Sequence, residues 1–167
     1  MRNSFKYSNF NKDNLLIALL NKANDTDYVS VMCSSISDRN SNLPIDYVNY
    51  DLIAGLGAKE TIISNNNSFE KLYNFHSNKK DWLFGYLSYD LKNEKEQLTS
   101  KNSDNLSADN LHFFIPEYVF LLRNGQLEVQ TENERYVCDK FVKSFNFSGF
   151  PSSRINVNFI QRDNKSA

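Results

Sequence analysis

The dipeptide Asn124-Gly125 constrains the fold most, because it lies between two apolar runs of strand-forming residues. Residues 117–123 read EYVFLLR, and residues 126–130 read QLEVQ. Asn-Gly between such runs is the strongest short signal for a β-hairpin, since both central residues of a type I′ turn need a positive φ angle. The sequence therefore predicts two neighbouring antiparallel strands joined by a tight turn.

The rest of the chain mixes strands with fewer helices. Apolar spacing predicts helices over residues 12–22, 68–75 and 136–145, and a charged helical turn over 91–98. Branched and aromatic runs predict strands over residues 28–33, 47–55, 59–64, 81–89 and 155–159. Gly55 and Gly57 indicate a bulge or a close backbone approach. This mixture predicts an α+β domain with a mainly antiparallel sheet.

The length, the net charge and the lack of an apolar signal region limit the classes of protein to which the chain can belong. The chain of 167 residues corresponds to one domain. Its 40% of hydrophobic residues suffice for a core. A net charge of -1 argues against nucleic acid or an anionic membrane as a partner. The start of the chain has no apolar signal region, and no run is long enough to span a bilayer. We therefore expect a cytoplasmic protein in which Cys33 and Cys138 are reduced and buried.

Independent catalytic signals are few. His76 and His112 have no nucleophile at a useful spacing, so structural or solvent-facing roles are expected for both. The stretch Gly55-Leu56-Gly57 lacks the pattern of a phosphate-binding loop. The acids at strand ends show no metal-pair spacing and are expected to face solvent or cap turns: Asp51, Asp81 and Asp90. The residues themselves predict no catalytic group and no metal site.

Three segments, taken in order, carry a family resemblance. They are VMCSS at residues 31–35, YDLIAGLG at residues 50–57 and WLFGYLSYDL at residues 82–91. Their order and spacing resemble the N-terminal half of the large components of aminodeoxychorismate synthase and anthranilate synthase. In the third segment the motif positions are Gly85, Tyr86, Tyr89 and Asp90. The resemblance covers nearly the whole chain.

The resemblance implies a fold, an activity and partners. It implies that residues 1–160 form the N-terminal part of an α/β/β/α sandwich, and that residues 161–167 begin a linker to a catalytic domain outside this chain. The complete family enzyme aminates chorismate, with Mg²⁺ bound in that catalytic domain and ammonia supplied by a glutamine amidotransferase partner. The 167 residues alone are accordingly expected to be inactive and to hold no cofactor.

The resemblance also implies a tryptophan-type pocket lined by Ser34, Tyr50 and Asp51. Two departures bear on it, because Cys33 stands where anthranilate synthases carry a glutamate and Asn49 where relatives often carry an arginine. Each lost charge-assisted hydrogen bond is worth about 1.5–3 kcal/mol, so tryptophan binding is expected to be weak. These departures favour the aminodeoxychorismate branch, on the route to folate.

Alternatives to that branch remain open. One is the N-terminal domain of an anthranilate synthase, and another is a stand-alone amino-acid-binding or interaction domain without catalysis. The Gly85-Tyr86…Tyr89-Asp90 pattern disfavours the related isochorismate and salicylate synthases. Structural roles are also open for the motif residues: Gly85 relieving crowding in a buried strand, Tyr86 and Tyr89 as core aromatics, and Ser34 capping a turn.

Overall fold

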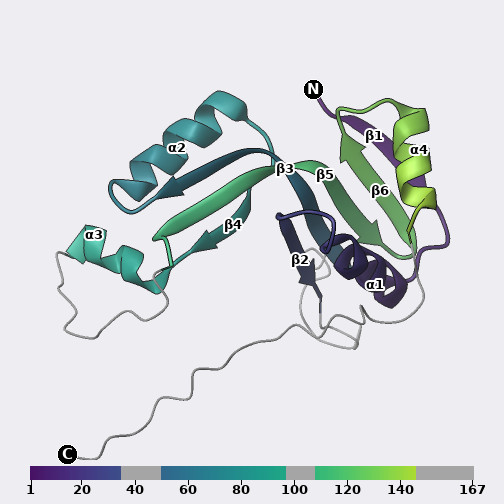
Figure 1. Cartoon of the computed structure of the whole chain (residues 1–167), viewed down its shortest axis with the longest axis horizontal. Helices are drawn as coiled ribbons and strands as arrows, with labels where there is room; N and C mark the ends of the chain where they lie inside the picture. The colour runs from purple at the N-terminus through teal and green to yellow at the C-terminus, as the bar shows by residue number, and fades with distance from the viewer. Residues whose placement is uncertain (35–49, 97–107, 146–167) are drawn as a thin grey trace, which may run out of the picture.

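The computed structural model describes residues 1–34, 50–96 and 108–145 (Figure 1). The helices are α1 (Lys12–Lys22), α2 (Ser68–Lys79), the 3-10 helix η2 (Tyr89–Lys92), α3 (Asn93–Glu96) and α4 (Arg135–Lys143). The strands are β1 (Asn3–Tyr7), β2 (Val29–Cys33), β3 (Leu52–Ser64), β4 (Phe84–Leu87), β5 (Leu111–Arg123) and β6 (Gln126–Thr131). The predicted strand 155–159 and linker 161–167 lie outside the described residues.

The strands of the described residues belong to one six-stranded sheet, in which every pair is antiparallel. The main path runs β1-β6-β5-β3-β2, and β4 joins the free edge of β5 beyond the end of β6. Strand β5 therefore pairs with β3 on one side, and on the other side first with β4 and then with β6. The predicted α+β class with a mainly antiparallel sheet is confirmed.

The hairpin between β5 and β6 forms where the sequence predicts it. Asn124 and Gly125 have φ angles of 50° and 75°. Both values are positive, as a type I′ turn requires. The Asp51 carboxylate accepts a hydrogen bond of 2.7 Å from the Asn124 amide, which ties the turn to the start of β3. The turn is therefore held by its own sequence and by a neighbouring strand.

Strand β3 corrects the prediction of two strands, because Leu52–Ser64 runs unbroken through both glycines. A register shift between Ala58 and Glu60 confirms a bulge in this region and leaves Lys59 as the extra residue. Ala58 faces Pro116. A proline cannot donate a ladder hydrogen bond and is tolerated inside a strand at such irregularities. Strand β5 consequently begins at Leu111, before the proline, instead of after it.

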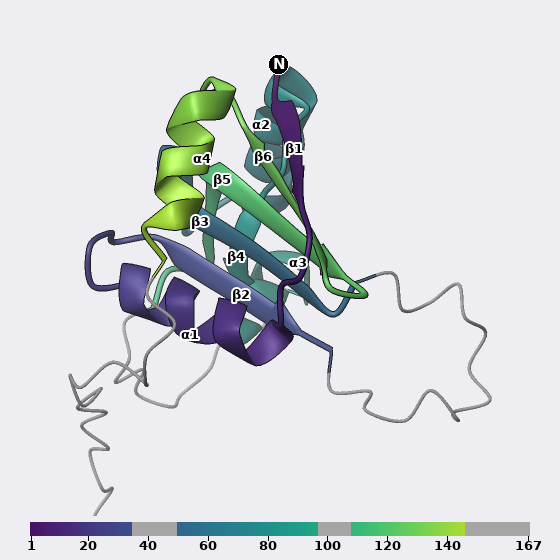
Figure 2. The ribbon, with the colours of Figure 1, turned by 90° about the vertical axis from the view of Figure 1, so that its right-hand side faces the viewer.

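The main core lies between one face of the sheet and helices α1 and α4, which Figure 2 shows on the same side. Asn11 begins α1, because its side chain accepts hydrogen bonds from the amides of Asp13 and Asn14, as an N-cap does. The core combines aliphatic and aromatic side chains from α1, β3, β5, β6 and α4: Leu15, Leu19, Leu52, Leu56, Phe120, Leu127, Val129 and Cys138.

A second cluster lies on strands alone and contains Phe84, Phe114, Val119 and Leu121. Its β4 member corrects the prediction of a buried strand over 81–89, since Phe84 is buried and Gly85, Tyr86 and Leu87 are exposed. The reason is position, because β4 is short and lies at an edge, so that only the residue packed on Phe114 is covered.

Other differences have equally local causes. Helix α2 continues to Lys79, beyond its predicted end at Phe75, and its first residue Ser68 is preceded by Asn67 as the N-cap. The sequence does not predict β1, because NSFKY has little apolar periodicity. Cys33 is exposed and not buried as expected, since it ends the edge strand β2, whereas Cys138 is buried as expected.

Candidate functional site

Two of the predicted pocket residues, Ser34 and Asp51, are neighbours in the structure. They follow β2 and precede β3, and the Ser34 amide donates a 3.0 Å hydrogen bond to the Asp51 carbonyl. The Lys12 ammonium group donates to the Ser34 carbonyl at 3.2 Å, which fixes the end of β2 against α1. The pairing register of β2 and β3 thus places the two residues side by side at one end of the sheet.

The side chain of Asp51 already has a structural task. Its carboxylate caps the amide of Asn124, and its own amide donates to the Leu122 carbonyl at 2.7 Å. Tyr50 is exposed and lines a hollow of about 470 Å³ together with Lys6 and Arg123. Of the three predicted pocket residues only Tyr50 borders that hollow, so the described residues do not gather them into one cavity.

The motif residues of the third segment do not form a common site. Gly85 lies so close to β5 that an added Cβ would overlap the His112 carbonyl oxygen and lie 2.6 Å from the Phe113 Cα. Its role is therefore to allow the close approach of two backbones, which agrees with the structural role left open for it, although the strand is exposed and not buried. Tyr86 and Tyr89 are 44% and 81% exposed, so the expectation that they are core aromatics is wrong. Asp90 is exposed in η2.

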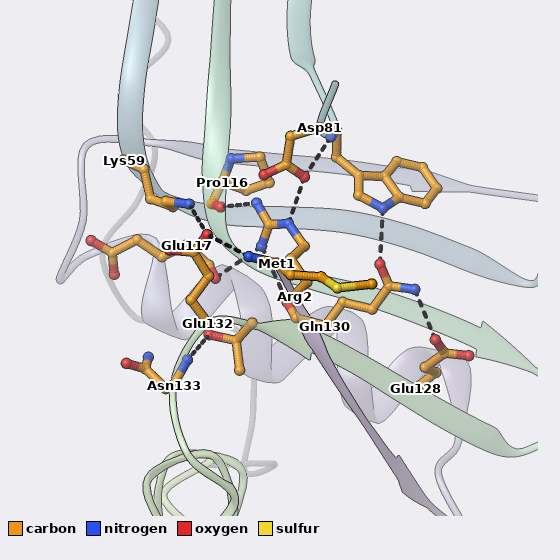
Figure 3. A network of polar contacts seen from close by, with 12 residues as sticks. Met1, Arg2, Lys59, Asp81, Pro116, Glu117, Glu128, Gln130, Glu132 and Asn133 are labelled. Carbon is orange, nitrogen blue, oxygen red and sulfur yellow. Dashed lines mark hydrogen bonds and ion pairs between the residues drawn. The ribbon is translucent and has the colours of Figure 1, made fainter. Parts of the chain in front are cut away.

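Sequence reasoning missed a polar network that centres on Arg2 (Figure 3). The guanidinium Nε donates to Asp81 Oδ1 at 2.6 Å, and Nη2 donates to the Pro116 carbonyl at 2.5 Å. Nη1 reaches the carbonyls of Glu117 and Gln130 at 3.2 Å and 3.4 Å. The Arg2 side chain is only 8% exposed, so these contacts replace its hydration.

The position of Arg2 follows from the topology. Strand β4 pairs with β5 up to Phe114, and β6 pairs with it from Tyr118 onward, so the β5 edge between them lacks a strand partner. Backbone carbonyls in such a gap need donors. Arg2 precedes β1 and supplies them, as the fork of guanidinium donors suits several acceptors at once. No local pattern links residues 2, 81 and 116, so the sequence holds no signal for this arrangement.

Two carboxylates lie among the cationic groups around Arg2. Burial raises the pKa of Asp81, but hydrogen bonds from Arg2 and from the Trp82 amide outweigh it, so the pKa lies below its usual value. The hydrogen bond from Lys59 lowers the pKa of Glu132, whose carboxylate lies 2.7 Å from the Lys59 ammonium and 3.8 Å from the chain's terminal amine. The bulge residue Lys59 therefore joins β3 to the end of β6.

A chain of hydrogen bonds continues from this network across the sheet. The Trp82 indole donates to Gln130 Oε1 at 2.9 Å, and the Gln130 amide donates to Glu128 at 2.8 Å (Figure 3). The Ser4 hydroxyl donates to the same Glu128 oxygen at 2.7 Å. The bonds from Gln130 and Ser4 lower the pKa of Glu128. The indole ring is consequently held in one orientation.

Beside the network lies a cleft of about 770 Å³. This volume falls within the size range of small-molecule sites. The cleft is bounded by the start of β1, the C-terminal end of α2, the segment before β4 and the end of β6. Its lining residues are Met1, Arg2, His76, Lys79, Lys80, Asp81, Trp82, Leu83, Gln130 and Glu132.

Comparison of the chain with protein-family models, with curated proteins and with solved structures finds no match. Within residues 1–34, 50–96 and 108–145, no three His, Cys, Asp or Glu side chains are grouped so that they could hold a metal ion. None of the helices that the structure describes has the length and apolar character needed to cross a membrane.

Proposed function

We propose that this chain is the N-terminal, non-catalytic part of a chorismate-aminating enzyme of the aminodeoxychorismate synthase type. The proposal starts from the three segments that occur in the same order as in that family. The comparisons with known proteins add nothing to it. The complete enzyme would form 4-amino-4-deoxychorismate from chorismate and glutamine-derived ammonia, with Mg²⁺ in its catalytic domain. This chain would supply part of the sandwich and the contact with a glutamine amidotransferase.

One observation carries the proposal furthest: the 3.0 Å hydrogen bond between the Ser34 amide and the Asp51 carbonyl. The resemblance names these residues as belonging to two adjacent strands around a shared pocket, and they are adjacent here. The antiparallel α+β sheet is compatible with one layer of such a sandwich. The strand-only cluster around Val119 and Leu121 would then belong to the face that meets the second sheet.

The experiment begins with the reading frame beyond codon 167. A catalytic domain of roughly 250–300 further residues with chorismate-binding character is expected, a second domain by length. The protein from the full frame should then convert chorismate with ammonia and Mg²⁺, while the 167 residues alone should show no turnover. A stop codon directly after residue 167, or a full-length protein inert toward chorismate, would refute the proposal and leave a stand-alone binding domain.

Tryptophan binding separates the two branches of the family. Cys33 and Asn49 replace charged residues, so calorimetric titration of the chain should show no tryptophan binding in the micromolar range. The variant Cys33→Glu restores one carboxylate at the exposed end of β2 and should strengthen binding, with Met32→Glu on the same strand as the matched control. Micromolar affinity in the unaltered chain would instead place it in the anthranilate branch.

A further inference from the structure

We infer that the cleft beside Arg2 binds a small carboxylate that carries an apolar ring. The cleft is separate from Ser34, Tyr50 and Asp51, which do not line it, so the inference goes beyond the proposed function. It is carried by the fixed indole of Trp82, by the Lys80 ammonium group, which has no partner among the described residues, and by the contacts that already engage Arg2 and the carboxylates.

The ring-binding element is Trp82, which is 37% exposed. Its indole stacks on Phe84, with ring centroids 6.1 Å apart and an interplanar angle of 27°, and its N–H is bound to Gln130. These contacts leave part of an immobilised aromatic surface at the edge of the cleft, beside Leu83. An ordered aromatic surface favours a planar ring, since little conformational entropy is lost when the ring stacks on it.

The charge-binding element is the C-terminal end of α2. Among the residues that the structure describes, the side chains of Lys80 and His76 form no hydrogen bond or ion pair, while Lys79 is paired with Glu60 at 2.6 Å. Cationic groups outnumber carboxylates in the lining, although the whole chain carries a net charge of -1. An excess of one sign in a concave site attracts the opposite charge.

The other ionic groups of the cleft already form pairs within the protein, and these pairs determine whether the ligand is an anion or a cation. Arg2 is engaged with Asp81 and with three backbone carbonyls, and Glu132 is engaged with Lys59. An organic cation would have to compete with Arg2 or Lys59 for these carboxylates. A carboxylate can reach Lys80 without breaking any of the pairs around Arg2.

The chain provides its own probe, because Trp82 is the single tryptophan in the sequence. Benzoate is titrated into the 167-residue protein while indole fluorescence is recorded. Benzyl alcohol carries the ring without charge, acetate the charge without a ring, and benzylamine the ring with the opposite charge. We expect a saturable change with benzoate, a dissociation constant that rises with added salt, and affinities at least tenfold lower for the three other compounds.

Variants then test the assigned cation. Lys80→Glu should weaken benzoate binding at least tenfold, whereas Lys143→Glu, on the exposed end of α4 and outside the lining, should leave it unchanged. The amide and indole N–H resonances of Trp82 in NMR spectra give a second readout and show that each variant is folded. Equal responses to benzoate and benzyl alcohol, preference for benzylamine, a change that does not saturate, or an unaffected Lys80→Glu variant would each overturn the inference.

Discussion

Replacing Arg2 by methionine should remove a large polar contribution to the stability of this fold. The change keeps a long apolar stem but removes the guanidinium donors of Asp81 and of the carbonyls of Pro116 and Glu117. Breaking one partner of a buried ion pair costs about 3–5 kcal/mol. Asp81 is 18% exposed and keeps a 2.7 Å hydrogen bond from the Trp82 amide. The lower end of that range, about 3 kcal/mol, therefore applies.

Urea unfolding followed by circular dichroism measures the difference in the free energy of unfolding between the variant and the unaltered chain. For a chain of this size, about 3 kcal/mol corresponds to a fall in Tm of about 6–12 °C. The matched control is Arg135→Met, because Arg135 is 63% exposed and lies 3.7 Å from Asp139. Such a surface pair is worth about 1 kcal/mol or less. If both variants lose the same stability, the argument that Arg2 fills a gap in the sheet is wrong.

Three further outcomes follow from the structure. Gly85→Ala should detach β4 from β5 and expose Trp82, seen as a red shift of its fluorescence, because the new Cβ meets backbone atoms of His112 and Phe113. In the control Gly125→Ala, the new Cβ meets nothing closer than 3.6 Å, so this variant should lose only about 1 kcal/mol, from its positive φ angle. The free energy of unfolding should be retained above about pH 4 and fall below it. The reason is that the pKa values of three carboxyl groups are lowered in the folded state: Asp81, Glu94 and Glu128. Protonation of these groups on acidification therefore favours the unfolded chain. Glu94 accepts a hydrogen bond from the Ser68 amide at 2.7 Å at the start of α2. Glu94→Gln should therefore flatten that acid limb and cost about 1 kcal/mol, as the loss of a helix cap does; a pH profile identical to that of the unaltered chain would contradict this role.

The sequence predicts those parts of the fold whose cause is local. The Asn124-Gly125 turn and the apolar spacing of α1 and α4 each act within a few residues, and the structure has these elements where expected. Strand β3 differs from the two strands that the sequence predicts, because glycine inside a strand pattern usually marks an irregularity. Its unbroken course depends on pairing with β5, a distant segment of the chain.

The candidate sites differ in the same respect, namely whether their contacts follow from neighbouring elements or from distant segments of the chain. The pairing of β2 with β3 places Ser34 beside Asp51, two residues that the family resemblance assigns to one pocket. The Arg2 network is not expected from the sequence, because it joins the start of β1, the segment before β4 and the middle of β5 through contacts up to 128 residues apart in sequence. The exposure of Tyr86 escapes prediction because an apolar run does not reveal whether its strand is central or at an edge. Tyr89 lies beyond the end of β4, in η2, and is also exposed.

The two long strands have a consequence for cooperativity. Strands β3 and β5 each pass through both halves of the molecule in Figure 1, from the region of α2 and β4 to that of α1, α4 and β6. Within each half the two strands pair with each other, since residues 52–58 of β3 face residues 116–122 of β5, and residues 60–64 face residues 111–115. Because β3 and β5 each run without a break from one half into the other, we expect their amide protons to open to solvent only when the whole sheet does.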